Sequence, residues 1–360
     1  MNLVVGKKSG TRYHLAPSAL VGQGVEGRVY RFGETCVKVL NGQPSAERSG
    51  VVRALSALAP KIPGFAWPLE AVVDPAKGEE AGFSMPFVPG ESLESLLDGR
   101  VTGSIPLEVK IRLALGAARA VAEAHAHRGP AIVLGDVIKA GNLIIDGGRA
   151  TFVDAASASV FGFRVASGAV VNSCSPLTTP GYVPREVLEN PGALPSEASD
   201  RFALAVLLFE LLAGRGPHEV RPCPASVGLE PDDCVRRGIY PRWARHPDFD
   251  APGYDPVDFP PEVDQLFRAA FLASAVRPSA LEWCETLEEW RDDVAPAWRR
   301  LRRRAPRWLR RVDPFSVTVV VLVALAYAAR WAWDFSTADR PPPPAPGREV
   351  GPPSFRELFR

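Results

Sequence analysis

The chain contains few cysteines, and their placement excludes two common kinds of cysteine site. None of the five is spaced as Cys-x-x-Cys, and they are scattered along the chain as Cys36, Cys174, Cys223, Cys234 and Cys284. An odd, dispersed set of this kind fits neither a disulfide framework nor a zinc site. We therefore expect reduced thiols in a cytosolic domain. The first ten residues also lack the long apolar stretch of a secretory signal peptide.

The chain also lacks a large excess of charge of either sign. It has 42 basic and 41 acidic residues, so its composition gives no reason to expect a nucleic-acid partner. The basic residues are unevenly placed, because eight arginines fall between residues 299 and 311. No internal repeat is recognisable. With 360 residues, of which 46% are hydrophobic, the chain is long enough for one large two-lobed domain and an additional segment.

The first 90 residues have the pattern of strands around a helix. Residues 28–32 and 35–40 alternate as paired strands, and Gly33-Glu34 between them can form a two-residue turn. A helix is expected from Ser45 to Leu58. Residues 83–88 are expected to form a last strand that leads into a short connector.

Apolar residues at helical spacing dominate the following part of the chain. Residues 107–127 and 202–212 each repeat them as an amphipathic or buried helix does. The predicted fold class is therefore α+β, with a small β-rich lobe followed by a larger helical lobe.

A glycine-rich loop, residues 22–29, leads into the first of the paired strands. Glycines let backbone N–H groups approach phosphate oxygens, because a β-carbon would hold the backbone away. A dinucleotide-binding domain would place such a loop between a strand and a helix, whereas here a strand and a hairpin follow it. This context favours a loop that covers a nucleotide, and a glycine-rich hairpin without a ligand is the alternative. The loop residues expected at the nucleotide are Gly22, Gln23, Gly24, Gly27 and Val29.

Charged residues stand at two unusual places in the predicted strands. Lys38 lies in mid-strand, where only a phosphate or carboxylate partner favours a lysine on the inner face; a surface-facing lysine is the alternative. Asp154 follows the short apolar run Thr151-Phe-Val, where a hard cation would find an oxygen ligand. Asp136 and Asn142 lie between them along the chain, after the first long helix. For Asp136, capping of its own loop is the alternative.

The order of these motifs, followed by Pro184-Arg-Glu186, resembles that of a bacterial Ser/Thr protein kinase of the eukaryotic-like family. The resemblance covers about residues 14–291 and implies the two-lobed protein kinase fold, with lobes at about 14–88 and 91–291. It also implies an enzyme that uses ATP and Mg²⁺, with Mn²⁺ as an alternative metal. The implied partners are ATP and a protein substrate.

The resemblance assigns catalytic and metal-binding roles to four residues. Asp136 accepts or orients the proton of the substrate hydroxyl, and Lys139 steadies the transferring phosphate. Asn142 and Asp154 bind the metal ion. Three further residues are implied to support the site. Asp200 braces the loop that carries Asp136, and Glu186 pairs with Arg277.

The nucleotide site is implied by the same resemblance. Lys38 holds the phosphates, and Glu47 is the acidic residue of the following helix that pairs with it. Met85 takes the gatekeeper position beside the adenine pocket, and residues 86–88 form the hinge. The remaining residues expected at the nucleotide are therefore Cys36, Met85, Phe87 and Val88.

The chain departs from the family pattern at three places. Leu134-Gly135 replaces the His-Arg that precedes the aspartate, so no positive charge is available there to bind a phosphorylated activation segment. Asn142 follows Asp136 by six positions, where the family has five. Ala155-Ala156 replaces Phe-Gly. Candidate phosphorylation sites between Asp154 and Glu186 are Ser157, Ser159, Ser167, Ser173, Ser175, Thr178 and Thr179.

The C-terminal region is expected to anchor the protein in a membrane. Residues 315–333 form an apolar run of roughly 28 Å at about 1.5 Å per residue; a buried core helix is the alternative. An Arg-rich linker, 292–314, precedes it, and a Pro-rich tail, 334–360, follows it outside the membrane. We therefore expect a single-pass protein of the inner (plasma) membrane that contacts lipid, with its kinase domain in the cytoplasm. A sensor protein or phosphatase is a further expected partner.

The function expected from the sequence is transfer of the ATP γ-phosphate to a protein serine or threonine in signalling. A pseudokinase that senses ATP or acts as a scaffold is the alternative. A third alternative is a kinase-fold enzyme that acts on a small molecule. Residues 179–186 argue against this third function, because they resemble a turn that docks a peptide.

Overall fold

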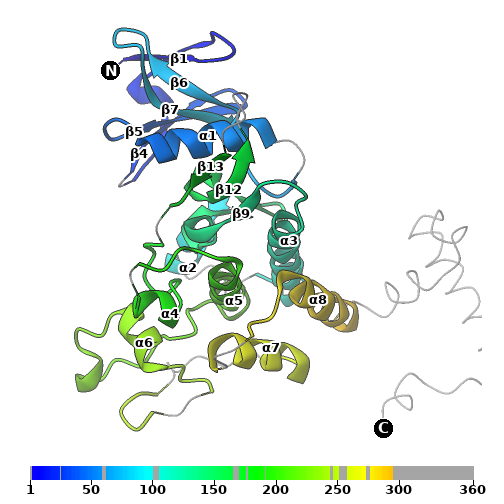
Figure 1. The fold of residues 1–360 in the computed structure, drawn as a ribbon. Coiled ribbons are helices and arrows are strands. Elements are labelled where there is room, and N and C mark those ends of the chain that lie inside the picture. The colour runs from blue at the N-terminus through cyan, green and yellow to red at the C-terminus, as the bar shows by residue number, and fades with distance from the viewer. Residues whose placement is uncertain are drawn as a thin grey trace, which may run out of the picture. The chain divides into compact units, whose positions relative to one another are not determined.

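A seven-stranded antiparallel sheet forms the N-terminal part of the protein in the computed structural model, in the order β2-β1-β6-β7-β5-β4-β3 (Figure 1). The predicted hairpin is confirmed, since β4 and β5 pair on either side of a turn at Gly33, where φ is +62°. The strands are β1 Leu3–Gly6, β2 Arg12–His14, β3 Leu20–Gln23, β4 Gly27–Phe32, β5 Thr35–Leu40, β6 Glu70–Asp74 and β7 Glu79–Pro86.

The structure describes most of residues 2–294. The described ranges are 2–24, 26–58, 62–99, 105–164, 170–175, 177–190, 192–243, 246–250, 258–272 and 276–294. All of them belong to one unit of the chain, residues 1–295.

Helix α1, Ala46–Leu58, joins the sheet to the rest of this unit. Its first turn is capped, because the Ser45 Oγ accepts a hydrogen bond of 3.2 Å from the Arg48 N–H. Val52 packs under the sheet with Phe83 and Met85, while Leu55 belongs to the large core of the helical part. Figure 1 shows α1 between the sheet and strands β12 and β13.

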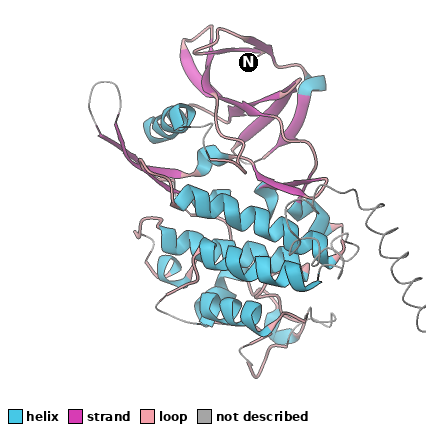
Figure 2. Ribbon diagram, turned by 90° about the vertical axis from the view of Figure 1, so that its right-hand side faces the viewer, coloured by secondary structure: helices cyan, strands magenta, loops and turns pink. Residues whose placement is uncertain are grey.

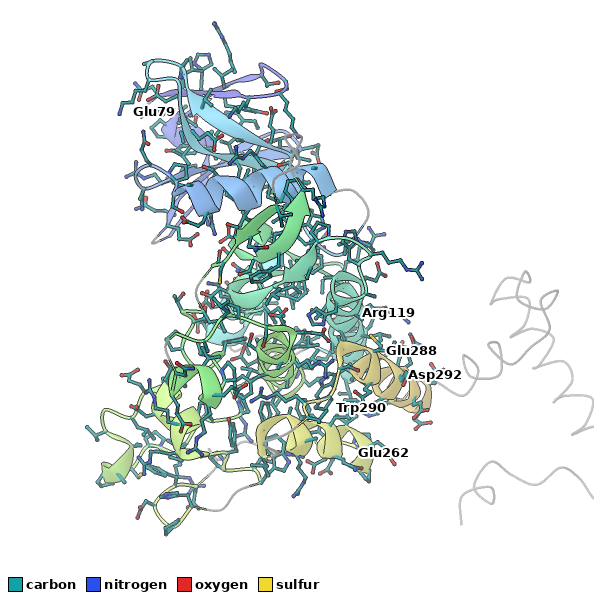
Figure 3. The ribbon with its side chains drawn as sticks, in the orientation of Figure 1. Glu79, Arg119, Glu262, Glu288, Trp290 and Asp292 are labelled. Carbon is teal, nitrogen blue, oxygen red and sulfur yellow. The ribbon has the colours of Figure 1, made fainter. Side chains whose placement is uncertain are left out.

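The helical part, whose helices lie next to one another in Figure 2, is built around α5, which is buried along almost its whole length. A capping box of Ser196 and Ser199 begins this helix, and Gly214 ends it with a φ of 73°. Helix α3 packs on α5 and α8, and Arg119 of α3 forms an ion pair with Glu288 of α8 (Figure 3). The helices are α2 Leu93–Asp98, α3 Leu107–His125, α4 Arg185–Leu188, α5 Glu197–Ala213, α6 Pro231–Arg237, α7 Pro261–Leu272 and α8 Ala280–Val294.

Two small sheets lie between the large sheet and the helices, and they carry the loops of the candidate site. One has the order β11-β10-β8, with β8 Glu91–Ser92, β10 Leu143–Asp146 and β11 Arg149–Phe152. The other has the order β13-β12-β9, with β9 Ala131–Val133, β12 Ser159–Arg164 and β13 Val170–Ser173. The short 3₁₀ turns are Pro17–Ala19, Gly135–Val137, Ala140–Asn142, Ala155–Ser157 and Pro224–Ser226.

Aromatic rings link the segment after α1 to strand β11. The ring of Phe65 lies 4.6 Å from that of Trp67 and 5.2 Å from that of Phe152, centroid to centroid. The indole N–H of Trp67 donates a hydrogen bond of 2.8 Å to the carbonyl oxygen of Ile62. Because all three rings are buried, this stack fixes the end of β11 from which the chain enters the candidate site.

The observed fold is a mixture of a curled β-sheet and several helices, and it is compatible with a kinase-like N-terminal lobe. The predicted helices at 107–127 and 202–212 are confirmed as α3 and α5. Strands β1 and β2 extend the sheet to residues before 14, where the predicted kinase domain begins.

The predicted location in the inner membrane is not supported and is withdrawn. Within the part of the chain that the structure describes, no helix combines the length and the apolar character required to cross a bilayer. The apolar run 315–333 on which the prediction was based lies outside the described residues, as do the tail 334–360 and most of the linker 292–314.

Candidate active site

Lys38 and Asp154 form the centre of the candidate site. Strand β5 places Lys38 under the sheet, and the chain leaving β11 brings Asp154 to it, so that Nζ lies 2.7 Å from both Oδ1 and Oδ2. Lys38 is 7% exposed. A lysine so deeply buried requires a counter-charge, which explains why this strand tolerates it. The sequence interpretation of an inward-facing lysine is thereby confirmed.

A second carboxylate reaches Lys38, and it is not the predicted one. Glu26, in the glycine-rich loop, places Oε2 2.7 Å from Nζ of Lys38 and 2.9 Å from Nη2 of Arg48. Glu47 is exposed on the outer side of α1, so the prediction that it pairs with Lys38 is wrong. The physical reason is the rotation of α1, which turns Arg48 rather than Glu47 toward Glu26 and Ser157. Arg48 therefore supplies a positive charge where an acidic residue was expected.

The charges around Glu26 alter its acidity. Burial on its own would raise the pKa of Glu26, but the hydrogen bond from Lys38 and the charges of Lys38 and Arg48 hold it below the usual value. Glu26 is therefore an anion in the region where nucleotide phosphates would lie. Sequence reasoning overlooked it, although it lies inside the glycine-rich loop.

The backbone of Asp154 is unusual. Its φ of 56° and ψ of 33° make it the one non-glycine residue with positive φ in the described part of the chain. Such a conformation costs free energy and is common at functional sites. The Ser157 hydroxyl donates a hydrogen bond of 3.1 Å to Oδ2 of Asp154, and Arg48 Nη2 lies 3.4 Å from the same hydroxyl. These contacts fix the carboxylate beside Lys38.

The glycines of the glycine-rich loop have different structural surroundings. A β-carbon on Gly27 would lie 2.2 Å from the carbonyl oxygen of Val39, so the close pairing of β4 with β5 requires glycine there. A β-carbon on Gly24 would meet no atom within 4 Å. Gly22 and Gln23 lie in β3, and Val29 pairs with Lys38 across the hairpin. Gly24 therefore has open surroundings, and so has Gly22, whose β-carbon would meet only the Cβ of Val29 at 3.8 Å.

The expected adenine side of the site lies at the end of β7. Met85 is buried with Cys36, Phe83 and Val52, and it pairs in register with Cys36. The Phe87 N–H donates a hydrogen bond of 2.8 Å to the carbonyl oxygen of Glu34, and Val88 is half-buried. The structure thus brings the predicted gatekeeper and hinge next to the strand that carries Lys38.

The loop with Asp136 and Asn142 folds back on itself. The Asn142 side-chain N–H donates a hydrogen bond of 2.9 Å to the carbonyl oxygen of Asp136, so the interval of six residues still holds the two together. The Asn142 carbonyl oxygen accepts a hydrogen bond of 2.8 Å from the N–H of Val153, next to Asp154. Nζ of Lys139 lies 3.4 Å from the hydroxyl of Thr179.

The carboxylate of Asp136 accepts hydrogen bonds from Thr178 and Thr179. The Thr178 N–H lies 3.0 Å from Oδ1 and 3.1 Å from Oδ2, and the Thr178 hydroxyl donates to Oδ2. The Thr179 N–H adds a contact of 3.4 Å to Oδ1. Thr178 was one of seven candidate hydroxyl residues in the sequence, and nothing there distinguished it from the others.

Asp200 supports the Asp136 loop from below, as predicted. Its fully buried carboxylate accepts hydrogen bonds from the N–H groups of Leu134 at 2.8 Å and Gly135 at 2.7 Å. The His125 Nε2 lies 3.0 Å from the same carboxylate. These contacts at the start of α5 hold the backbone just before Asp136.

Two further pairs hold the segment after Thr179. Arg277 binds Glu186 through both guanidinium nitrogens, at 2.5 and 2.8 Å, which confirms the predicted pair. The buried Tyr182 hydroxyl forms a hydrogen bond with Glu210 and accepts another, of 3.1 Å, from the Ala140 N–H. Burial raises the pKa of Glu210 to about 8, and the Tyr182 hydrogen bond opposes that shift. The segment is therefore anchored to α5 and to the Asp136 loop.

Comparison with known proteins gives partial matches to plant protein kinases. The chain is 33% identical over 145 residues to the proline-rich receptor-like protein kinase PERK2 of Arabidopsis thaliana, which is 40% of this chain and 19% of the plant protein. It is 32% identical over 153 residues to PERK15 of the same plant, 41% of this chain and 27% of PERK15. A rice protein, salt tolerance receptor-like cytoplasmic kinase 1, is 30% identical over 118 residues, 32% of each chain.

These matches support a protein kinase, and they cover part of this chain and part of each relative. The chain spans between a fifth and a third of the length of these curated relatives. No family model matches the chain.

Proposed function

We propose that this chain is an ATP-dependent protein kinase of the Ser/Thr type. The observation that carries the proposal is the contact of Nζ of Lys38 with both carboxylate oxygens of Asp154, at 2.7 Å. A cation for phosphates beside a carboxylate for a metal ion is the combination that phosphoryl transfer requires. The partial identity to plant protein kinases supports the same conclusion.

The residues present fit a Mg²⁺ or Mn²⁺ ion. Asp154 offers carboxylate oxygens and Asn142 an amide oxygen, which are the hard ligands that such ions take. When bound, the ion supplies positive charge that stabilises the transferring phosphoryl group. Lys38 would hold the nucleotide phosphates, and the backbone around Gly24 would cover them. Because Lys38 engages both Asp154 oxygens, binding of nucleotide and metal is expected to loosen this pair.

Asp136 and Lys139 would act on the substrate side. Asp136 would accept the proton of the incoming hydroxyl, and Lys139, near Thr179, would steady the phosphate as it moves. The Asn142 bond to the Asp136 carbonyl supports these roles, because it keeps the proposed base beside a proposed metal ligand despite the longer interval.

The test is phosphate transfer by the purified full chain. With labelled ATP and Mg²⁺ or Mn²⁺, we expect transfer to an array of serine and threonine peptides. Asp136→Asn and Asp154→Asn are each expected to abolish transfer, and only Asp154→Asn to weaken metal-dependent ATP binding greatly. Transfer that persists in both variants would come from a contaminating kinase and would count against the proposal.

A nucleotide-sensing or scaffolding protein without transfer is the second candidate function. It is favoured by the occupation of the site by the chain's own groups, with Glu26 on Lys38 and Thr178 on Asp136. ATP binding without transfer to any peptide, under either metal, would establish this second function instead.

A further inference from the structure

One carboxylate oxygen of Glu26 lies between two cations that come from different elements. Nζ of Lys38, on β5, donates a hydrogen bond of 2.7 Å to Oε2 of Glu26. Nη2 of Arg48, on α1, donates one of 2.9 Å to the same oxygen. Against the effect of burial, which raises it, the pKa of Glu26 is lowered by these two cations and also by the charge of Lys139. The structure thus contains a position for an anionic oxygen, and the chain's own glutamate occupies it.

The place of Arg48 at this position does not depend on Glu26 alone. The Arg48 side chain is 14% exposed, and Nη2 also lies 3.4 Å from the hydroxyl of Ser157. The helix is held just before Arg48, because the buried Ser173 hydroxyl donates a hydrogen bond of 2.5 Å to the carbonyl oxygen of Glu47. The guanidinium is therefore expected to stay at the site when Glu26 leaves it.

Glu26, in contrast, has room to move. Its side chain is 51% exposed, and it belongs to the glycine-rich loop, in which a β-carbon on Gly24 would meet no atom within 4 Å. Lys38 and Arg48 are largely buried and lie on a strand and a helix. The anion is therefore the exchangeable partner in this cluster, and the two cations are the fixed ones.

We infer that Arg48 is a phosphate-binding residue of the nucleotide site, which binds a phosphate oxygen of ATP in place of Oε2 of Glu26. The inference rests on the nucleotide site of the proposed function and adds a residue to it. A guanidinium donates its hydrogen bonds in a planar fork that fits a phosphate group, and Nζ of Lys38 would bind the same group from the other side. Helix α1 thus contributes a positive charge to the phosphates, where the kinase resemblance implies a glutamate that pairs with Lys38.

A different role for Arg48 would have the opposite effect on ATP binding. If Arg48 only held Glu26 over the site, its removal would free the loop and tighten ATP binding, whereas removal of a phosphate ligand weakens it. The substitution Glu26→Gln separates the two roles. In that background no carboxylate is left at residue 26 for Arg48 to hold, and any remaining effect of Arg48 on ATP comes from the phosphates.

Isothermal titration calorimetry of the full chain with ATP and Mg²⁺ measures this effect. In the Glu26→Gln background, Arg48→Gln should raise the dissociation constant for ATP about tenfold, the loss expected for one charge-assisted hydrogen bond. Adenosine, which has no phosphate, should bind equally well with and without Arg48→Gln. Arg53→Gln, at an exposed position of the same helix, removes an equal charge and should leave the ATP affinity unchanged.

The outcomes separate this inference from the proposed function. An unchanged or lower dissociation constant for ATP in the double variant would overturn the inference, and an equal loss of adenosine affinity would do so too, because it would show a structural effect of Arg48. ATP binding that depends on Arg48, without transfer to any peptide, would overturn the kinase activity and support the phosphate contact. Absence of ATP binding in the wild-type chain would overturn both.

Discussion

Nζ of Lys38 lies 2.7 Å from each of the two carboxylate oxygens of Asp154, although the two residues are 116 positions apart in the sequence. Glu26 adds a third oxygen at the same distance. The lysine is thus surrounded by anions of its own chain. A nucleotide that uses Lys38 has to compete with them, and the strength of that competition can be measured.

Glu26→Gln should tighten ATP binding. The substitution removes a negative charge from the loop expected over the phosphates and frees Lys38 from one partner. For a partly exposed charge worth about 1 kcal/mol, the dissociation constant should fall roughly threefold to tenfold. Isothermal titration calorimetry would measure it. Glu34→Gln, at the exposed turn of the β4–β5 hairpin, is the matched control and should leave it unchanged. Unchanged affinity in Glu26→Gln would show that Glu26 does not face the nucleotide.

Asp200→Asn should destabilise the Asp136 loop. The new NH₂ group would face one of the N–H donors of Leu134 and Gly135, in a fully buried position. A buried donor without an acceptor costs about 1–3 kcal/mol, which corresponds to a fall in Tm of roughly 3–10 °C. Differential scanning calorimetry would show this fall, and the transfer rate should fall as well. Asp98→Asn, at the exposed end of α2, should leave the Tm unchanged.

Glu210 should make the stability of the protein depend on pH. Its pKa is about 8 in the folded protein against 4.5 without the fold, so the folded state binds the proton more tightly. Its contribution to the free energy of unfolding is therefore full below about pH 4.5 and is lost as the pH rises toward about 8. Glu210→Gln should flatten the fall in stability across that window.

Urea unfolding at several pH values between these limits would measure the effect. Glu34→Gln again serves as the control, because this residue is exposed. If the wild-type and Glu210→Gln curves stay parallel from pH 4.5 to 8, the carboxyl of Glu210 is not protonated in the folded state.

Gly135→Ala should loosen the contact between Thr178 and Asp136. Alanine is strained at a φ of +56°, and its β-carbon would lie 3.1 Å from Cδ2 of Leu177, so the end of the Leu177 side chain has to shift. Gly162→Ala is the matched control, since its φ is +77° and its β-carbon would meet no atom within 4 Å. Both variants should lose stability from backbone strain, but only Gly135→Ala should speed proteolytic cleavage near Thr178. Equal cleavage in the two variants would argue against the Leu177 contact.

Local sequence patterns were sufficient for the elements that hold the site. The β4–β5 hairpin follows from alternation and a glycine turn, and α5 from its apolar run after a polar start. The motif order also identified Lys38 and Asp154 correctly as partners of the same region, although no local pattern joins β5 to the end of β11.

Local patterns could not show which residue of α1 faces the site, and the prediction of Glu47 as the partner of Lys38 failed for this reason. Val51 and Val52 are both buried, so Glu47 and Arg48, four residues before each, were both plausible on the inner face of α1. Only the packing of the helix against the sheet decides between them. Thr178 depends in turn on Leu177 lying over Gly135, a contact between segments far apart in sequence.

The stack of Trp67, Phe65 and Phe152 gives the protein a built-in optical probe. The ring of Phe65 lies between the indole of Trp67 and the ring of Phe152. Phe152 precedes Asp154 by two residues. The fluorescence of a buried indole changes when its neighbours shift. A ligand that displaces Asp154 should therefore alter the fluorescence of Trp67. Among the eight tryptophans, the difference spectrum between wild type and Trp67→Phe isolates that signal. Events at the Asp154 carboxylate can thus be followed in real time without any attached label.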